Sequence, residues 1–506
     1  MFTKASVSHV FFVLLVVMFL LAGMLLTRVA VATASRTADL PAELSTKDWA
    51  PSWSAARSGD TLAGQGEAAC SPLLSGSGQW AKTYGGTHDD FARSIQQTSD
   101  GGYIVAGKTS SSGAGGDDIW VLKLDASGNV AWQKAYGGDN HDEAHAIQQT
   151  ADGGYIVAGE TYTFGAGNYD VWILKLDSAG NVTWQNTYGG THDDYAYSIQ
   201  QTADSGYIVA GKTTSFGAGG PDVWLLKLDA SGSVTWQKTY GKNLDDWANS
   251  IRQTPDGGYI MAGGSVGGGW SAFWIVKLDA SGNVTWEKLY GGSEWDEASF
   301  VQQTSDGGYI VAGWTASFSA DHHADIWVLK LDTNGDIAWQ KVYGGTGYEK
   351  AYAIQQTSNG GYIVAGFVSS FGAGNDDVWG FTLDASGNIL WEKTYGTALG
   401  DQAYSVQQTT DGGYVVAGYD KLYNSLSGAD FLVLKLDANG DVANCPTEGT
   451  SSATVTIPTY DAGVRSPTVK VPSYTKTTPS PTVTTTTIIQ KQVCPTINLY
   501  LPLISK

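Results

Sequence analysis

The chain has 506 residues, and its 49 acidic residues outnumber its 29 basic residues, which gives a formal net charge of −20 at pH 7. An acidic surface repels phosphate backbones, so we expect no nucleic-acid partner. The sequence also contains no recognisable phosphate-cradling loop, nucleophile elbow or paired-cysteine metal site, which argues against several common enzyme classes.

The first 76 residues do not have the pattern of a folded domain. Residues 1–34 are predicted to be a cleaved signal peptide, because Lys4 precedes an apolar run from Val10 to Leu26 and small residues follow at Ala30, Ala32 and Ala34. A retained membrane anchor is the alternative, and only then do we expect contact with a membrane. Residues 35–76 lack a periodic apolar pattern and are predicted to be a flexible lead-in.

One unit is repeated seven times between Trp80 and Asp437, with successive copies 50 to 53 residues apart. Each copy opens with the motif Trp-x-x-x-Tyr-Gly, whose tryptophans are Trp80, Trp132, Trp184, Trp236, Trp286, Trp339 and Trp391. An acidic residue follows each tryptophan by ten positions, at Asp90, Asp142, Asp194, Asp246, Asp296, Glu349 and Asp401. A period of this size indicates a supersecondary unit that buries its apolar surface only by stacking on its neighbours.

Each unit contains four strand signals separated by turn signals. In the first complete unit these are Ala92–Thr98, Tyr103–Gly107, Ile119–Leu124 and Asn129–Lys134, and no segment has an apolar period of 3.6 residues. The second strand is apolar at every position, so both of its faces are expected to be buried. Small four-stranded sheets packed face to face around an axis provide that environment, which predicts a β-propeller.

The number of blades follows from the two ends of the repeat array. The strand around Trp80 precedes the first complete unit, while the last unit has Asn444 where an eighth tryptophan would fall. The simplest closure pairs the Trp80 segment with the strand Phe431–Leu436, which removes an open seam. We therefore predict an all-β, seven-bladed propeller of four-stranded antiparallel blades over residues 77–444, closed by an N-terminal strand that completes the last blade.

The stretch Leu228–Trp236, Leu-Asp-Ala-Ser-Gly-Ser-Val-Thr-Trp, resembles the tryptophan-docking repeat of pyrroloquinoline-quinone-type propellers. That family includes quinoprotein dehydrogenases and non-catalytic assembly scaffolds, so the resemblance implies a fold more than an activity. The chain departs from the family in having seven blades instead of eight and no adjacent cysteine pair. The resemblance places no cofactor-contacting residue on this sequence, and we expect no cofactor.

The composition changes after the repeats. Residues 445–490 are rich in Thr, Ser and Pro, which predicts an extended stalk or linker. Residues 491–506 form a short apolar segment that is similar to the Leu-Pro-Leu endings of some exported bacterial proteins, with a terminal strand as the alternative. In an oxidising compartment Cys70 and Cys445 are predicted to form a disulfide that locks the closure, and Cys445 with Cys494 is the competing pair.

Comparison of the seven copies indicates which face of the propeller carries a site. The tight turns barely change, whereas the loops between blades and those after the second strand vary, and loops on a rigid scaffold commonly carry function. Histidines beside acids in these loops suit zinc or copper, with solvated surface histidines as the commoner alternative. The metal candidates are His88, His141, His192, His322 and His323.

Aromatic residues beside acids are the second kind of candidate on this face. Trp247, Trp270 and Trp295 differ from their counterparts in other units, and such residues stack on sugar rings or act as hot spots for protein partners. The acids counted with them are Asp90, Asp142, Asp194, Asp246 and Asp296, although a residue present in every unit is expected first to cap loop amides.

These features favour a secreted or cell-surface propeller that acts as a binding or scaffold module for protein or surface-matrix partners. A carbohydrate-binding propeller is the first alternative, and a quinone-dependent or polysaccharide-degrading enzyme is the second. An enzyme would need a catalytic set that breaks the repeat, and Glu349-Lys350 is the clearest break in the sequence. We expect a monomer without enzymatic activity.

Overall fold

The computed structural model describes residues 78–319, 321–421 and 428–442, together with five short strands between residues 454 and 492. These residues all belong to one compact unit, Ala69–Lys506. The expected signal peptide, the lead-in and the three cysteines lie outside the described residues. Within the described part of the chain, no helix is long and apolar enough to cross a membrane.

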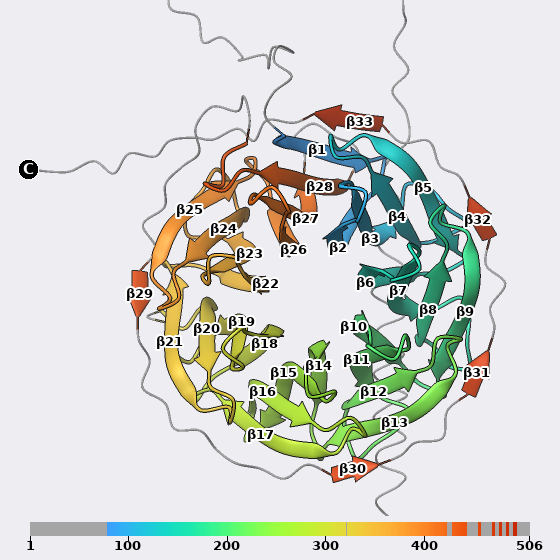
Figure 1. Ribbon diagram of the computed structural model, residues 1–506, viewed down its shortest axis with the longest axis horizontal. Helices are drawn as coiled ribbons and strands as arrows, with labels where there is room; N and C mark the ends of the chain where they lie inside the picture. The colour runs from blue at the N-terminus through green and yellow to red at the C-terminus, as the bar shows by residue number, and fades with distance from the viewer. Residues whose placement is uncertain are drawn as a thin grey trace, which may run out of the picture. The chain divides into compact units, whose positions relative to one another are not determined.

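The described chain forms seven antiparallel sheets arranged in a ring around a central axis (Figure 1), which confirms the predicted fold class. Each sheet is a blade whose first strand lies nearest the axis. Blade 1 contains β2 (Asp90–Gln97), β3 (Tyr103–Thr109), β4 (Asp118–Leu124) and β5 (Val130–Gly137). Blade 2 contains β6 (Asp142–Gln149), β7 (Tyr155–Thr161), β8 (Asp170–Leu176) and β9 (Val182–Gly189). Blade 3 contains β10 (Asp194–Gln201), β11 (Tyr207–Thr213), β12 (Asp222–Leu228) and β13 (Val234–Gly241).

The remaining blades repeat this order. Blade 4 contains β14 (Asp246–Gln253), β15 (Tyr259–Gly267), β16 (Trp270–Leu278) and β17 (Val284–Tyr290). Blade 5 contains β18 (Asp296–Gln303), β19 (Tyr309–Thr315), β20 (Asp325–Leu331) and β21 (Ile337–Gly344). Blade 6 contains β22 (Glu349–Gln356), β23 (Tyr362–Val368), β24 (Asp377–Leu383) and β25 (Ile389–Tyr395).

Blade 7 is built from both ends of the repeat array. Its strands are β26 (Asp401–Gln408), β27 (Tyr414–Lys421), β28 (Ala429–Leu436) and, on the outside, β1 (Trp80–Gly85). The register of the closing pair runs from Trp80 opposite Lys435 to Tyr84 opposite Phe431. The predicted closure by an N-terminal strand is therefore confirmed.

The repeated tryptophan and tyrosine link each blade to the next. Trp132 Nε1 of blade 1 donates a 3.2 Å hydrogen bond to the carbonyl of Ser178 in blade 2, and the Tyr136 hydroxyl donates a 2.6 Å bond to the carbonyl of Gly180. Gly180 has a φ of 75°, and a Cβ there would lie 2.8 Å from the Trp132 ring, so glycine is required at this turn. The Asp-x-x-Gly turn and the tryptophan thus form one inter-blade joint.

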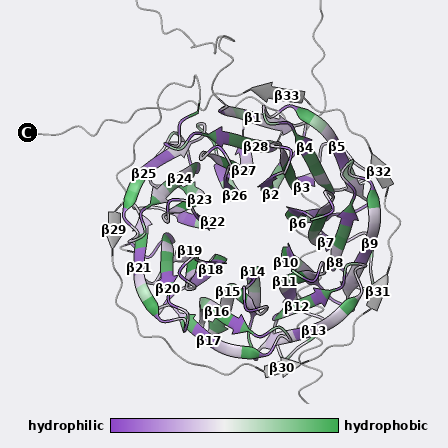
Figure 2. Ribbon diagram, viewed as in Figure 1, coloured by the Kyte–Doolittle hydropathy of each residue, from purple (hydrophilic) through white to green (hydrophobic). Residues whose placement is uncertain are grey.

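The hydrophobic core lies between neighbouring blades. Ile104 and Ile119 of blade 1 pack against Tyr155 and Trp172 of blade 2, and equivalent clusters follow around the ring. Figure 2 shows hydrophobic residues on the strands of the blades. The second strands are buried on both faces, as their continuous apolar sequence predicted. Because burial of one large apolar side chain stabilises a fold by about 1.5–3 kcal/mol, these inter-blade layers supply most of the driving force for stacking.

Five further strands come from the segment that composition predicts to be a stalk. They are β29 (Thr454–Thr456), β30 (Thr468–Lys470), β31 (Thr475–Thr477), β32 (Thr482–Thr484) and β33 (Ile489–Gln492). Each pairs antiparallel with the outermost strand of one blade, namely β21, β13, β9, β5 and β1 in that order (Figure 1). Blades 4 and 6 have four strands within the described part of the chain.

Candidate functional site

The recurring acids begin the innermost strands and lie beneath the loops that join the blades. All five candidate aspartates are at most 2% exposed. Asp142 is typical, because its Oδ2 accepts hydrogen bonds from the Gly138 amide at 3.0 Å and from the Thr163 hydroxyl at 2.9 Å. These contacts are those of a loop cap, and a ligand-binding role for the five aspartates stays a prediction.

A second set of buried acids lies beside the first, and the sequence analysis did not single it out. In blade 1 the Asp118 carboxylate accepts a 2.8 Å hydrogen bond from the Ala114 amide. A Cβ on Gly137 would lie 1.7 Å from Asp118 Oδ1 and 2.9 Å from Asp142 Oδ2, so the two carboxyl groups converge on this glycine. Burial, with the nearby Asp142 charge, raises the pKa of Asp118 to about 7.

The same arrangement recurs in other blades. Burial raises the pKa values of Asp170 and Asp377 to about 6, and burial with the neighbouring Glu349 carboxyl group raises that of Asp325 further. The sequence does contain a signal for this second set of acids. In every unit except blade 4, an aspartate stands two positions before the tryptophan or leucine of the third strand. Blade 4 has Ala272 at this position.

Two of the three candidate tryptophans are exposed on the loop face, Trp270 in blade 4 and Trp295 in the loop that joins blades 4 and 5. Trp270 is 45% exposed and Trp295 is 42% exposed, and their rings meet edge to face with centroids 6.1 Å apart. Trp270 begins β16 directly after Gly268 and Gly269, both of which have positive φ, so the hairpin of this blade replaces the longer loop of its neighbours. We call Trp270 and Trp295 the tryptophan pair.

Contacts connect the tryptophan pair to the loops of blade 5. Glu294 Oε1, in the residue before Trp295, lies 2.9 Å from His322 Nδ1. His323 Nδ1 lies 3.0 Å from Asp321 Oδ2, and the His323 ring lies 4.6 Å from the ring of Tyr348, which is 52% exposed. The loop face over blades 4 and 5 therefore presents exposed aromatic rings beside ionisable side chains.

Trp247, the third candidate tryptophan, does not join the pair. It is partly buried on the innermost strand β14, where its Nε1 donates a 2.9 Å hydrogen bond to Glu297 Oε1. The side-chain amide of Asn249 donates to the same oxygen at 2.8 Å. The structure thus places Trp247 with inner-strand residues and not among the loops.

The histidine candidates are dispersed over the loop face. His88 and His192 each contact the preceding threonine, and His322 and His323 contact different carboxylates. Among the described residues, His141 is the one histidine candidate in a possible ligand group, in which atoms of His141, Glu143 and Glu160 lie within 4.8 Å of one another.

Cations already occupy the surroundings of this group. Arg93 Nε lies 2.6 Å from Glu143, and His145 Nε2 lies 2.7 Å from Glu160. His141 itself lies 2.8 Å from Asp117, and that hydrogen bond raises the pKa of His141 to about 9. A protonated imidazole is a poor metal ligand, so the geometry describes a network of ion pairs, and metal binding by the histidine candidates stays a prediction.

Glu349 and Lys350 of blade 6, which depart most clearly from the repeat, both contact other residues of the fold. Glu349 is fully buried, and its Oε2 accepts a 2.9 Å hydrogen bond from the Gly345 amide, as the aspartates do in other blades. Lys350 Nζ lies 3.9 Å from the centroid of the Trp314 ring, a cation–π geometry. Both side chains therefore have a packing role, and an enzymatic role for them has no geometric support.

The strongest variation among the copies is found on the innermost strands, although the sequence analysis predicted it in the loops. The residue after the recurring acid is Phe91, Glu143, Tyr195, Trp247, Glu297, Lys350 or Gln402. The residue two positions later is Arg93, His145, Tyr197, Asn249, Ser299, Tyr352 or Tyr404. Comparing the copies strand by strand, instead of loop by loop, would have found this feature.

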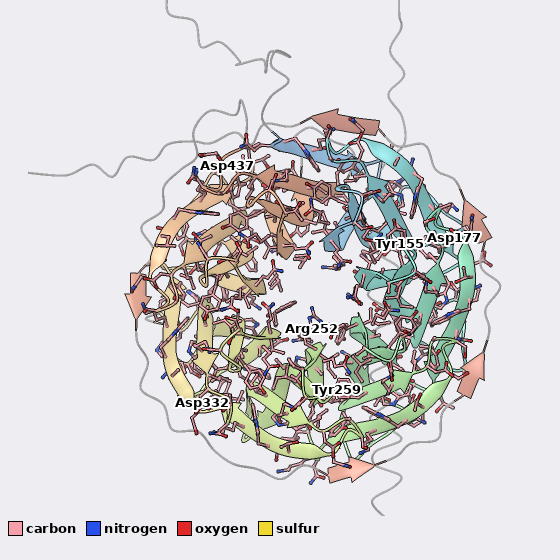
Figure 3. The ribbon with its side chains drawn as sticks, viewed as in Figure 1. Tyr155, Asp177, Arg252, Tyr259, Asp332 and Asp437 are labelled. Carbon is pink, nitrogen blue, oxygen red and sulfur yellow. The ribbon has the colours of Figure 1, made fainter. Side chains whose placement is uncertain are left out.

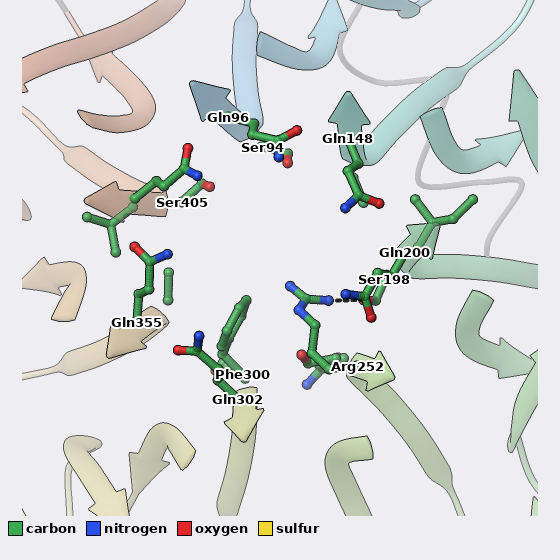
Figure 4. A pocket seen from close by; sticks show the side chains of 18 of the residues that line it. Ser94, Gln96, Gln148, Ser198, Gln200, Arg252, Phe300, Gln302, Gln355 and Ser405 are labelled. Carbon is green, nitrogen blue, oxygen red and sulfur yellow. Dashed lines mark hydrogen bonds between the residues drawn. The ribbon is translucent and has the colours of Figure 1, made fainter. Parts of the chain in front are cut away.

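The second of these variable positions, together with residues further along the innermost strands, lines a cavity of about 700 Å³ in the central channel. Figure 3 shows Arg252 reaching from its strand toward the channel, and Figure 4 shows the cavity lined by glutamine and serine side chains. Arg93, His145 and Arg252 are the ionisable lining residues other than tyrosines, and none of the lining residues is an aspartate or glutamate. The cavity is thus locally basic within a strongly acidic chain.

Fold and channel together define the protein as a seven-bladed β-propeller repeat protein. No family model matches the chain, and no curated protein matches its sequence, so the likeness to pyrroloquinoline-quinone-type repeats stays a resemblance. Solved structures similar to it include Sqt1 of Chaetomium thermophilum bound to the N-terminus of ribosomal protein L10, with 12% identity and a TM-score of 0.45 over 70% of this chain and 98% of that chain. A Dyadobacter fermentans protein of unknown function has 12% identity and a TM-score of 0.39 over 70% and 98% of the two chains. These values are too low to carry an argument about function.

Proposed function

We propose that this protein is an extracellular binding or scaffold module that engages a protein partner through the loop face of blades 4 and 5. The observation that carries the proposal is the exposed tryptophan pair of blade 4. Exposed tryptophans are costly to leave in water, and tryptophan is enriched among the residues that dominate the affinity of protein interfaces. Secretion is part of the proposal and rests on the N-terminal sequence pattern.

The surroundings of the pair suit a protein interface. Leu244, which is 47% exposed, lies in the preceding inter-blade loop, and Tyr348 lies in the following one. The Glu294–His322 contact adds polar side chains at the edge of this area. Protein interfaces commonly combine an aromatic and aliphatic centre with such a polar rim.

Carbohydrate binding is the second candidate, and the geometry of the same two rings favours it. The rings of Trp270 and Trp295 are inclined by 85°, so they offer two differently oriented faces to a ligand. The C–H faces of sugar rings stack on such surfaces while carboxylates accept bonds from sugar hydroxyl groups. A glycan screen separates this candidate from the first.

The double substitution Trp270→Ala/Trp295→Ala is expected to remove binding and leave the fold intact, because both side chains are largely exposed. Binding is measured by crosslinking to cell-surface proteins and by a glycan array. We expect loss of one set of signals by about tenfold or more, as for interface hot spots. Tyr162→Ala is the matched control, because Tyr162 is 45% exposed in the corresponding loop of blade 2. Partners captured equally by the double variant and the parent would contradict the proposed site.

A further inference from the structure

One side chain departs from an otherwise regular ring of equivalent residues around the channel cavity. Six positions after each recurring acid the chain has glutamine in six blades and Arg252 in blade 4. The glutamines are Gln96, Gln148, Gln200, Gln302, Gln355 and Gln407, and all of them line the cavity with Arg252. Figure 4 shows the guanidinium group of Arg252 extending into the cavity.

Arg252 has no acidic partner among the described residues. Its Nη1 donates hydrogen bonds to Ser198 Oγ at 3.1 Å and to the Ile251 carbonyl at 2.7 Å, and its guanidinium carbon lies 4.7 Å from the Phe300 ring centroid. None of the ion pairs among the described residues includes Arg252. Burial lowers the pKa of Arg252 only to about 10, so the side chain stays charged at neutral pH.

The other cations facing the cavity are compensated. Arg93 is paired with Glu143 at 2.6 Å, and His145 is paired with Glu160 at 2.7 Å. Arg252 is therefore the one cation of the cavity lining whose charge no described side chain offsets. Arg252 is partly buried, and a charge that is partly removed from water without an acidic partner has a cost that a bound anion would offset.

We propose that this channel cavity binds a small oxyanion ligand, a carboxylate or a phosphate, with Arg252 as its charge partner. The planar guanidinium group suits both classes because it can present parallel N–H donors to two oxygens. The surrounding glutamine amides and serine hydroxyls offer donors to further polar atoms of the ligand. This site is separate from the tryptophan pair, so either can fail without the other.

The chain supplies its own matched control for this site. Arg252→Gln restores the residue present in the other six blades and is expected to fold at least as well as the parent, because it removes an unpaired charge. Titration calorimetry with inorganic phosphate and with acetate, in chloride buffers of constant ionic strength, distinguishes the two anion classes. We expect one of them to bind the parent and to bind the Arg252→Gln variant about tenfold or more weakly.

Equal binding by parent and variant would overturn the proposal, and so would absence of heat with both anions. A correctly folded variant is verified by its circular dichroism and melting temperature. Arg252→Lys is a second variant that keeps the charge but not the planar fork, and it is expected to bind with intermediate affinity.

A different observation, in the C-terminal segment, carries a second inference. The first residues of its strands, Thr454, Thr468, Thr475, Thr482 and Ile489, are separated by seven residues or by twice seven. Each pairs with the glycine that follows the repeated tyrosine, namely Gly344, Gly241, Gly189, Gly137 and Gly85. Five blades therefore receive a tail strand in the same register.

The sequence of the segment has the matching period. Thr454, Thr468, Thr475 and Thr482 begin successive heptads of the pattern Thr-x-x-x-Pro or its variants, with prolines at Pro458, Pro472 and Pro479. Threonine suits strands, whereas proline has no N–H to donate and so suits the positions between strands. Seven extended residues span roughly 23–25 Å. The strands of three successive heptads, β30, β31 and β32, pair with the outer strands of the neighbouring blades 3, 2 and 1.

The heptad that would serve blade 4 departs from this pattern. It begins at Asp461 and includes Gly463 and Arg465 in place of the strand-favouring and proline residues. In the described part of the chain, β17 of blade 4 is one of the two outer strands that receive no tail strand. The sequence exception and the structural exception therefore coincide.

We propose that residues 454–492 form an intramolecular belt, in place of the expected stalk, that adds a fifth strand to successive blades. An outer strand exposes unpaired backbone groups along its edge, and strand addition satisfies them while blocking edge-to-edge aggregation. The belt ends on β1, the strand that closes the ring. It thereby covers the one blade assembled from two distant parts of the chain.

Hydrogen exchange on the full chain tests the belt. A chain that ends after Val442 is expected to exchange the edge amides of β1, β5, β9, β13 and β21 about tenfold faster, because their ladder partners are removed. The outer strands β17 and β25 serve as internal controls and are expected to be unchanged. Equal exchange in all seven outer strands with and without the segment would overturn the proposal in favour of a stalk.

A deletion pair tests the period itself and does not require removal of the whole segment. Deletion of the heptad 475–481 keeps the later strands in phase, so protection of 482–484 and 489–492 is expected to persist. Deletion of the three residues 478–480 shifts the later strands out of phase with the blades and is expected to abolish that protection. A shift by an odd number of residues turns the other face of a strand inward. Identical exchange in both deletion variants would contradict a phased belt.

Discussion

A chain that begins at Gly86 is expected to lose the folded ring or to melt tens of degrees below the parent. It lacks β1, so blade 7 retains three strands and the edge of β28 is left open. It also loses Tyr84, which is fully buried and donates a 2.6 Å hydrogen bond to the Gly128 carbonyl of blade 1. Trp80, whose Nε1 donates to the Ala126 carbonyl at 3.1 Å, is lost with it. Removal of one large buried aromatic side chain typically costs about 3–5 kcal/mol, which is a large part of the stability of a domain.

A chain that begins at residue 78 keeps the closing strand and is the control for this prediction. Tyr84→Ala is a milder variant that keeps the backbone ladder with β28 and is expected to lose about 3–5 kcal/mol of unfolding free energy. Urea denaturation followed by tryptophan fluorescence measures all three. If the chain beginning at Gly86 unfolds at the same urea concentration as the control, the ring does not depend on closure by β1.

The blades could be predicted from the sequence because every copy of the repeat gives the same evidence for the four-stranded unit. Seven tryptophans at near-constant spacing give the unit, and a second strand that is apolar throughout requires cover on both faces. The closure could also be predicted, since Trp80 has no preceding unit and Asn444 replaces an eighth tryptophan. These inferences need only the apolar pattern of each strand and the number of units, and seven near-identical copies show the same pattern.

The channel residues could not be placed in the same way. Each innermost strand contains a β-bulge, such as the register shift between Ala248 and Ser250 in β14. A bulge inserts a residue into one strand, so simple alternation from Asp246 assigns the wrong face to the residues beyond it. Whether Arg252 faces the channel is therefore decided by a backbone irregularity that the repeat pattern does not reveal.

Trp247 lies apart from the other two candidate tryptophans for a related reason. Trp247 directly follows the recurring acid Asp246 and lies in β14. Trp295 directly precedes the recurring acid Asp296 and lies in the loop before β18. One tryptophan thus lies just inside its strand and the other just before the strand begins, and this difference of two positions separates a side chain packed on the innermost strand from one exposed in a loop. The tail strands were missed because three-residue strands carry too little local signal.

The second large effect is a loss of stability as the pH rises from about 4 to about 9. An aspartate in the unfolded chain titrates near pH 3.9. Burial raises the folded pKa of Asp118 to about 7 and those of Asp170 and Asp377 to about 6. A group whose folded pKa is raised binds its proton more tightly in the folded state, so its contribution is complete below the unfolded pKa and is lost as the pH rises through the folded pKa.

Other groups set the limits of this window. The hydrogen bond to Asp117 raises the pKa of His141 to about 9, and its contribution is likewise lost toward alkaline pH. Burial opposes ionisation of Glu143, but the hydrogen bond from His141 and the charge of Arg93 lower its pKa, so its contribution is lost at acid pH instead. The melting temperature is therefore expected to be highest near pH 4 to 5 and to decrease by several degrees toward pH 9.

The triple substitution Asp118→Asn/Asp170→Asn/Asp377→Asn is expected to flatten this dependence. Asparagine mimics the protonated acid, because it keeps an acceptor for the loop amides and can donate to the neighbouring carboxylate. The variant should melt near the parent at pH 4 and above it at pH 9. Asp139→Asn, at an exposed loop position, is the matched control and should follow the parent at every pH. A melting temperature of the parent that stays constant or rises over this range would contradict the prediction. It would show that ionisation of the paired carboxyl groups does not lower the free energy of unfolding.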